Sequence, residues 1–243
     1  FGGGATSTVS GNLTVSSTGA VGQSANLTVA NGTANFSLSG NDLTLNQSAN
    51  NFNTVVLTNV GNATLRDTNA ITLGNVALTG ALTVTSGGTQ NQAAGTTMNV
   101  STGTATFNAG TNAITFSNAG NDFGTVAVTT TGNATFADTN AIVLGAVSAG
   151  NLSVTTNNSA VTQSGTMNVS LGTASFNTGT GAVTLNLANN FGTVAVTTTG
   201  NASFTDTNAI VLGGVSAGNL QVSTTNGAIT QSGTVVVLSL IHI

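Results

Sequence analysis

The stretch that decides the fold occupies residues 121–156 and reads NDFGTVAVTTTGNATFADTNAIVLGAVSAGNLSVTT. Residues 189–224 repeat it almost letter for letter as NNFGTVAVTTTGNASFTDTNAIVLGGVSAGNLQVST, and residues 50–85 carry a looser copy. Such self-similarity is typical of a repeat protein, in which each unit packs against the next. The carboxylate that all copies share sets a period of 71 and then 68 residues, at Asp67, Asp138 and Asp206.

Within each copy, short runs of alternating apolar and hydroxyl residues are separated by Gly or Asn. From residue 125 onward the runs read TVAV, ATF, AIVLGAV and LSVTT. Alternation with a period of two, rich in β-branched residues and Phe, indicates strands, and no segment has the apolar spacing of a helix. Because strands this short cannot bury a face alone, we expect three-sided coils of roughly 20 to 25 residues that stack on one another.

The predicted fold is therefore all-β: a parallel β-helix (β-solenoid) with about three strands per coil and roughly ten coils. Coils about 4.8 Å apart would form a rod around 50 Å long. We expect residues 1–237 to form a single continuous solenoid, with long repeats near residues 50–120, 121–188 and 189–237. The rival fold, an antiparallel sandwich or barrel, usually shows hairpin turns and does not require a long-period echo.

Residues 238–243, LSLIHI, depart from the repeat. The internal echo aligns QSGTMNVSLG at residues 163–172 with QSGTVVVLSL at residues 231–240, and the match ends at Leu238. The six residues are also what a transposase adapter used in sequencing libraries encodes when it is read in frame. We therefore expect this tail to be adapter read-through and not native, which removes His242 from the candidate functional residues.

In the predicted solenoid, Val, Ile, Leu and Phe point into a narrow core while Thr and Ser point outward. Gly-Asn pairs are expected at the corners between strands, because Gly and Asn tolerate a positive φ. These pairs begin at Gly61, Gly132, Gly150, Gly200 and Gly218.

Composition excludes several classes of function. Only 2% of the residues are charged, the net charge is −4, and the chain has one Arg and no Lys. A chain with one cation cannot neutralise a run of phosphates, so we expect no nucleic-acid binding and no binding to an anionic membrane surface. No apolar run reaches the roughly 18 to 20 residues of a membrane-spanning helix. Gly, Ser and Asn in bulk can mean disorder, but 39% hydrophobic residues in recurring positions favour an ordered chain.

The repeated carboxylates are candidates for general acids or calcium ligands. Equivalent positions three coils apart would lie roughly 14 Å from each other, too far for a shared metal or a carboxylate pair. The glycine-aspartate nonapeptide of calcium-binding β-rolls is absent, and Asp122 is expected at a different corner from Asp138. We therefore predict that Asp67, Asp138 and Asp206 are turn residues whose side chains accept the backbone N–H two residues on.

Two comparisons between copies support an architectural role. Where one copy has Asp122, the others have Asn51 and Asn190, so an amide serves there as well as an acid. Arg66 beside Asp67 is interpreted as an exposed ion pair of small energetic worth.

Catalysis by Ser or Thr needs a base, and with His242 discounted no His, Lys or Glu is left to provide it. We predict no catalytic, cofactor-binding or metal-binding residues and no enzyme activity. A carbohydrate-active β-helix enzyme would need clustered Asp with Lys or Arg, so it is the weaker alternative. Thr-rich runs such as TVAVTTTG leave an ice-binding solenoid as another alternative, although a regular Thr-x-Thr in every coil is missing.

The ordered set NDFGTVAV, DTNAIVLGAV, GNLSVTT and AVTQSG resembles the long repeat regions of filamentous-haemagglutinin-type exoproteins and related bacterial β-strand-repeat surface proteins. The resemblance covers roughly residues 9–237. It implies a right-handed parallel β-helix, export from a Gram-negative cell, often by two-partner secretion, and a cell-surface or extracellular rod that carries adhesive or toxic modules. The expected function is a structural stalk with an adhesive surface for an unknown host-cell, glycan or surface ligand, in which each repeat stacks on its neighbours.

Overall fold

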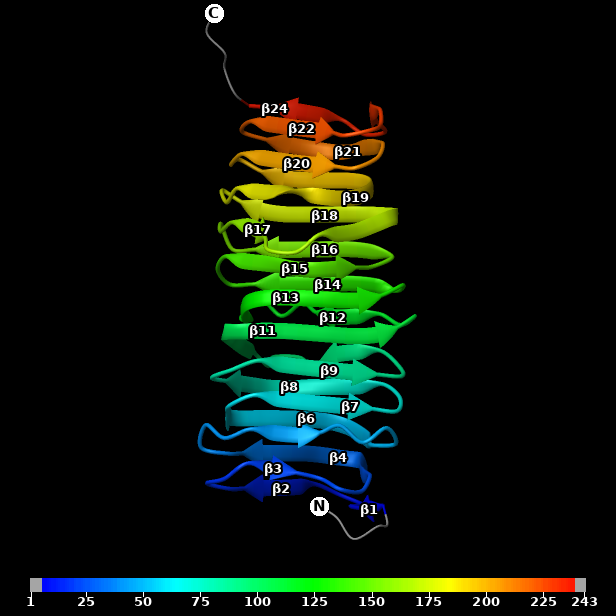
Figure 1. Cartoon of the computed structure of the whole chain (residues 1–243). Coiled ribbons are helices and arrows are strands. Elements are labelled where there is room, and N and C mark those ends of the chain that lie inside the picture. The colour runs from blue at the N-terminus through cyan, green and yellow to red at the C-terminus, as the bar shows by residue number, and fades with distance from the viewer. Residues whose placement is uncertain (1–5, 239–243) are drawn as a thin grey trace, which may run out of the picture.

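The protein is a β-solenoid in which all secondary structure is strand. The computed structural model describes residues 6–238, and its strands form one continuous stack with β1 at one end and β24 at the other (Figure 1). The predicted all-β parallel solenoid is confirmed, with about 12 turns where roughly ten coils were expected. Within residues 6–238 no helix is long and apolar enough to cross a membrane.

The 24 strands have the following bounds: β1 Ser7–Thr8, β2 Leu13–Ser16, β3 Val21–Gly22, β4 Leu27–Ser37, β5 Leu43–Leu45, β6 Asn51–Val60, β7 Ala63–Asp67, β8 Ile71–Leu78, β9 Leu82–Ser86, β10 Gln90–Gln92, β11 Met98–Gly110, β12 Ile114–Phe116, β13 Asp122–Thr130, β14 Asn133–Asp138, β15 Ile142–Ser148, β16 Asn151–Thr156, β17 Val161–Gln163, β18 Met167–Gly179, β19 Val183–Thr198, β20 Ala202–Asp206, β21 Ile210–Ala217, β22 Leu220–Thr224, β23 Ile229–Gln231 and β24 Val235–Val237. The expected adapter-encoded tail lies outside the described residues except for Leu238, whose N–H donates to the Ala217 carbonyl at 2.9 Å.

Alternation of side chains along each strand builds the core. In β16, Leu152 and Val154 are buried while Ser153 between them is partly exposed. Most other strands alternate in the same way, although bent strands such as β15 break the alternation once and all three residues of β23 are exposed. Every Phe from Phe36 onward is buried. Phe107 packs against Phe116 with ring centroids 4.5 Å apart and against Phe136 at 5.8 Å, so aromatic contacts link successive coils.

The coils are of two kinds, which differ at a bulge. A short coil holds two strands, such as β14 and the bent strand β15, and the next coil holds β16, β17 and β18. Val126 pairs with Leu144 and Val128 with Val147, so β15 contains one extra residue at the bend. The part of β15 before the bend pairs with β17, and the part after it pairs with β18. The bulge therefore opens a new face, as it also does in β8 and β21.

The long repeat does not contain a whole number of coils. Ile71 pairs with Gln90, Gln90 with Ile114, and Ile114 with Ala134, so three coils separate Ile71 from Ala134. The sequence counterpart of Ile71 is Ile142, which lies in the next strand, β15. Each long repeat thus takes three coils and one further face, so equivalent residues of successive copies lie on different faces of the rod.

The corner glycines are required for a different reason from the one expected. All five Gly-Asn pairs lie at bends between strands, as predicted, but none of these glycines has a positive φ. The preceding coil instead leaves no room for a side chain: a Cβ at Gly132 would lie 2.6 Å from the Asn112 carbonyl oxygen, and one at Gly61 would lie 2.7 Å from the Gly40 oxygen. Close stacking, and not backbone handedness, fixes glycine at these corners.

This crowding predicts which glycines tolerate a methyl group. Gly172→Ala is expected to lower the free energy of unfolding by about 1–3 kcal/mol, because its Cβ would overlap the Gly150 carbonyl oxygen. Gly214→Ala is the matched control, since no atom lies within 4 Å of its added Cβ and the neighbouring copy already has Ala146 there. Urea denaturation followed by far-ultraviolet circular dichroism measures both variants, and equal midpoints would contradict the stacking argument.

Candidate functional site

The repeated carboxylates lie inside the wall of the solenoid. Asp67, Asp138 and Asp206 end β7, β14 and β20, and each is buried, with at most 3% of its surface exposed. An unpaired buried carboxylate is costly, so its two oxygens need donors. These carboxylates are the strongest chemical feature of the chain and define the candidate site.

Each carboxylate accepts two backbone N–H groups, one from its own turn and one from a neighbouring coil. One oxygen of Asp138 accepts the N–H of Asn140 at 2.8 Å, as predicted for a turn residue. The other accepts the N–H of Phe123 at 2.6 Å, which the sequence did not predict. The same pair of bonds occurs at Asp67, from Asn69 and Phe52 at 2.8 and 2.6 Å, and at Asp206, from Asn208 and Phe191 at 2.7 and 2.6 Å.

The second bond closes a face of the solenoid. One such face opens at Val76, which pairs with Met98 in the next coil. In the coil after that, Asp122 pairs with Asn99, and Phe123 follows Asp122 in the same strand. The chain then turns away after β14, so the carboxylate of Asp138 takes the place of a strand carbonyl for Phe123. A bulge opens a face and an aspartate ends it, once in every long repeat.

Asp122 lies beside the Asp138 turn, and the expectation that it sits at a different corner is wrong. Its Oδ1 accepts the side-chain N–H of Asn140 at 3.1 Å. In the other copies the Oδ1 atoms of Asn51 and Asn190 accept the equivalent bonds, from Asn69 and Asn208, both at 3.2 Å. The prediction that an amide serves at this position as well as an acid is confirmed.

A second polar element, which the sequence analysis missed, is a pair of amides in each copy, a buried Asn and a partly buried Gln. Asn189 is fully buried, and its Oδ1 accepts the N–H of Met167 at 2.9 Å and the Gln163 Nε2 at 2.9 Å, while its Nδ2 donates to the Gln163 Oε1 at 3.0 Å. Asn121 with Gln92 and Asn50 with Gln23 form the same reciprocal pair. The signal was present in the sequence as a Gln that precedes each Asn-x-Phe by 26 to 29 residues.

Burial sets the electrostatics of the site. It raises the pKa of the Asp138 carboxyl from the ordinary 3.8 to about 6, the N–H bonds from Phe123 and Asn140 oppose this, and the charge of Asp122 adds to it. Burial also raises the pKa of Asp67, against the N–H bonds from Phe52 and Asn69.

The remaining charged groups do not assemble with the carboxylates. Arg66 is exposed and Asp67 is buried, because neighbouring residues of a strand point to opposite sides, so the expected exposed ion pair between them is wrong. Asp67 and Asp206 lie on one ladder of paired strands, because β7 is linked to β20 through β9, β11, β13, β15, β17 and β19, whereas β14 with Asp138 pairs with β12 and β16 on another face. The expectation that the carboxylates stand above one another at intervals of three coils is therefore wrong as well. Among residues 6–238 no group of three or more His, Cys, Asp or Glu could hold a metal ion.

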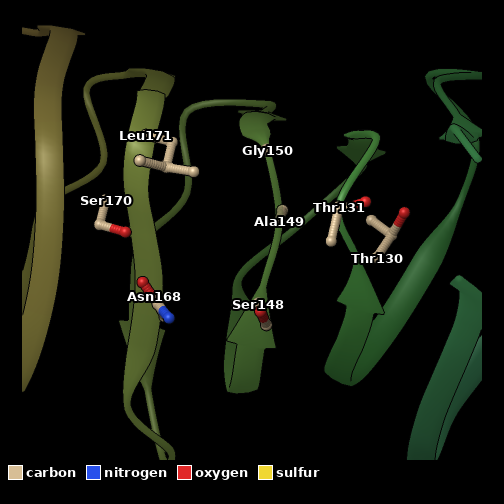
Figure 2. A pocket seen from close by; sticks show the side chains of 8 residues that line it. All are labelled: Thr130, Thr131, Ser148, Ala149, Gly150, Asn168, Ser170 and Leu171. Atoms are coloured by element: carbon tan, nitrogen blue, oxygen red, sulfur yellow. The ribbon is translucent and has the colours of Figure 1, made fainter. Parts of the chain in front are cut away.

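A shallow groove of about 160 Å³ crosses three neighbouring coils. Figure 2 shows Leu171 and Ser170 on one side of it, Ala149 and Gly150 in the middle, and Thr131 on the other side. No ionisable side chain lines the groove. Leu171 is 98% exposed, where the other copies have Thr102 and Asn31. The groove therefore combines hydroxyl and amide groups with the apolar surface of Ala149 and Leu171.

Comparison with known proteins places the chain among repeat sequences. A family model described as repeats of unknown function (DUF5649) matches four consecutive segments, residues 4–59, 60–130, 131–198 and 199–239. The last three segments begin at the bends that precede β7, β14 and β20, and the first segment adds a copy ahead of the three recognised from the sequence. No curated protein and no solved structure matches the chain.

Removing the carboxylate should expose its role. Asp138→Ala is expected to cost about 1–3 kcal/mol of unfolding free energy, because the buried N–H of Phe123 loses its acceptor. Asp122→Asn is the matched control and should change stability little, since the other copies carry Asn there. Hydrogen exchange by NMR provides the local readout, and unchanged protection of the Phe123 amide in Asp138→Ala would contradict the assignment.

The raised pKa predicts the direction of the pH dependence. Because the folded pKa of Asp138 is about 6 and its ordinary value is 3.8, the folded state holds the proton more tightly than the unfolded state. This contribution to stability is fully present below pH about 4 and is lost as the pH rises through about 6. Carboxyl ¹³C NMR measures the titration, and Asp122→Asn should lower the pKa of Asp138; an unchanged or higher pKa would contradict the assigned coupling.

Proposed function

The chain belongs to the DUF5649 family of repeats, and we propose that it works as a structural stalk segment of a large secreted or cell-surface bacterial protein. The observation that carries the proposal is the continuous stack of parallel strands from β1 to β24. Because each coil adds about 4.8 Å, about 12 turns convert the sequence into a rod of roughly 55 Å. The mechanism is geometric, because each added repeat increases the length of the rod and so the distance that the rod spans.

The exterior suits contact with neutral polar partners. Thr, Ser and Asn cover the outward positions, and the carboxyl groups of Asp67, Asp138 and Asp206 lie inside the wall. The groove beside Leu171 combines hydroxyl and amide groups with the apolar side chains of Ala149 and Leu171, and no charged side chain lines it. These features support an adhesive role toward glycans or a host-cell surface, as in the filamentous-haemagglutinin-type exoproteins that the repeats resemble, and export by two-partner secretion is part of the same proposal.

We also propose that the segment has no catalytic activity. The carboxylates of Asp67, Asp138 and Asp206 are bonded to backbone N–H groups and lie more than three coils from one another, so they are not arranged as an acid–base pair. The five described Asp contain one close pair, Asp122 and Asp138, and Asn140 donates to both of them. Polysaccharide cleavage would need at least two carboxyl groups facing a substrate.

An ice-binding surface is the second candidate, favoured by one outward column of threonines. Thr44 pairs with Thr64, Thr64 with Thr83, and Thr83 with Thr106, so four hydroxyl-bearing side chains stand above one another. The column is one threonine wide at Thr44 and Thr64, whose outward neighbours two positions away are Asp42 and Asn46, and Asn62 and Arg66. It is two threonines wide at Thr83, beside Thr85, and at Thr106, beside Thr104. Thermal hysteresis of the purified chain separates the candidates, since a stalk should show none.

Length is the property that tests a stalk. Duplicating residues 121–188 directly after residue 188 keeps the register, so the rod should lengthen by about 16 Å, the rise of three coils and one further face. Small-angle X-ray scattering measures the maximum dimension. Inserting residues 121–154 at the same place is the control, because it breaks the register and should lower the unfolding midpoint. A duplicated chain that gains width in place of length would refute the proposal.

A further inference from the structure

The bend in the middle of β18 differs from the equivalent bends of other copies by one apolar side chain. Three residues separate Val169 and Thr173 in β18, and one residue separates their partners in β19, so the chain bulges outward here. Leu171 lies in this bulge and is 98% exposed, whereas the same bulge carries Thr102 in β11 and Asn31 in β4. Because an exposed leucine buries no apolar surface, Leu171 does not stabilise the fold.

The polar side chains beside this leucine are free to bind a ligand. In a neighbouring copy, the hydroxyl of Ser101 donates to the Oδ1 of Asn99 at 3.0 Å. The counterparts of these two residues are Ser170 and Asn168, and their side chains form no hydrogen bond within the described part of the chain. The hydroxyl of Ser148, which lines the same groove, is likewise without a partner among residues 6–238.

The groove is small, mixed in polarity and uncharged. Its volume of about 160 Å³ lies below the range of about 300–1,000 Å³ that is usual for drug-sized ligands. Figure 2 shows Ala149 and Gly150 between Leu171 on one side and Thr131 on the other. A pyranose ring has apolar C–H groups on its face and hydroxyl groups around its edge, so a single sugar matches both the apolar and the polar part of this lining.

Other classes of ligand match the groove less well. A purely aliphatic ligand would leave the free hydroxyl and amide groups without partners where it excludes water. An ionic ligand would lose hydration without gaining a partner charge, since no charged side chain lines the groove. The lining therefore favours a ligand that is neutral and has both polar and apolar faces.

We propose that this groove binds one neutral sugar unit of a glycan, with Leu171 against the apolar face of the ring and Asn168, Ser170 and Ser148 bonded to its hydroxyl groups. The inference rests on the adhesive role proposed above and deepens it, because it names the site and the class of ligand. A single sugar in a shallow groove should bind weakly, with a Kd of about 1 mM. Firm adhesion then requires several chains bound to one glycan-coated surface.

NMR titration of the ¹⁵N-labelled chain with methyl α-mannopyranoside, methyl β-glucopyranoside and methyl β-galactopyranoside tests the site. We expect at least one of these glycosides to shift the amide signals of Ala149, Gly150 and Leu171 saturably, with one sugar per chain. Leu171→Thr should weaken this binding about five-fold or more through the lost apolar contact, and it should fold, since Thr102 occupies that place in another copy. Leu187→Thr is the matched control: this leucine is 41% exposed and does not line the groove, so its exchange should leave binding unchanged.

No saturable shift with any of the three glycosides, equal binding by Leu171→Thr, or shifts confined to another face would overturn the proposal. Tighter binding of glucuronate or glucosamine than of the methyl glucoside would overturn the assignment to a neutral sugar. A dimer in sedimentation velocity that Leu171→Thr abolishes would make the groove an interface between two copies and would also overturn it. Because the rod dimension measured by scattering does not depend on the sugar, failure here is distinguishable from failure of the stalk proposal.

Discussion

Backbone pairing between successive coils is the constraint on which the rest of this structure depends. Each coil directs its N–H and C=O groups toward the coils above and below it, and a buried group that loses its partner costs about 1–3 kcal/mol. Wherever a face ends, a side chain has to supply the missing acceptor. Asp138 does so for Phe123, and Asn121 does so for Met98. The polar residues that recur in the sequence are therefore parts of the hydrogen-bonded wall.

The same constraint shapes the surface. Of the five aspartates, Asp67, Asp138 and Asp206 lie inside the wall, which leaves Asp42, Asp122 and Arg66 as the charged side chains outside it among the described residues. The solenoid gains its cohesion from backbone bonds, buried Phe rings and aliphatic side chains, so it does not need surface ion pairs. A neutral exterior of Thr, Ser and Asn suits a stalk that contacts its partners through hydrogen bonds to neutral groups.

The sequence predicted the fold well because the fold depends on local patterns. Alternation in runs such as TVAV gives strands, and the long echo gives stacking, whatever the exact register. The site was predicted only in part. The bond from Asn140 to Asp138 is local and follows from the turn, whereas the bond from Phe123 depends on which coil lies beneath. Which coil lies beneath is set by bulges such as the one at Gly145, and the alternation of apolar and polar residues alone does not reveal these bulges.

The bulges also explain why the copies do not stand above one another. A repeat counted in sequence suggests whole coils, but the extra residue in β8, β15 and β21 opens a face, and the repeat advances by three coils and one further face. Successive copies thus present their corners in different directions around the rod.

Cysteine cross-linking tests the central claim of in-register stacking most directly, because the chain has no native Cys. Thr64 and Thr83 are partners in adjacent coils, whereas Thr135 is the sequence counterpart of Thr64 on a different face. The account predicts that Thr64→Cys with Thr83→Cys forms a disulfide under mild oxidation and that Thr64→Cys with Thr135→Cys does not. Cross-linking of the second pair in place of the first would contradict it.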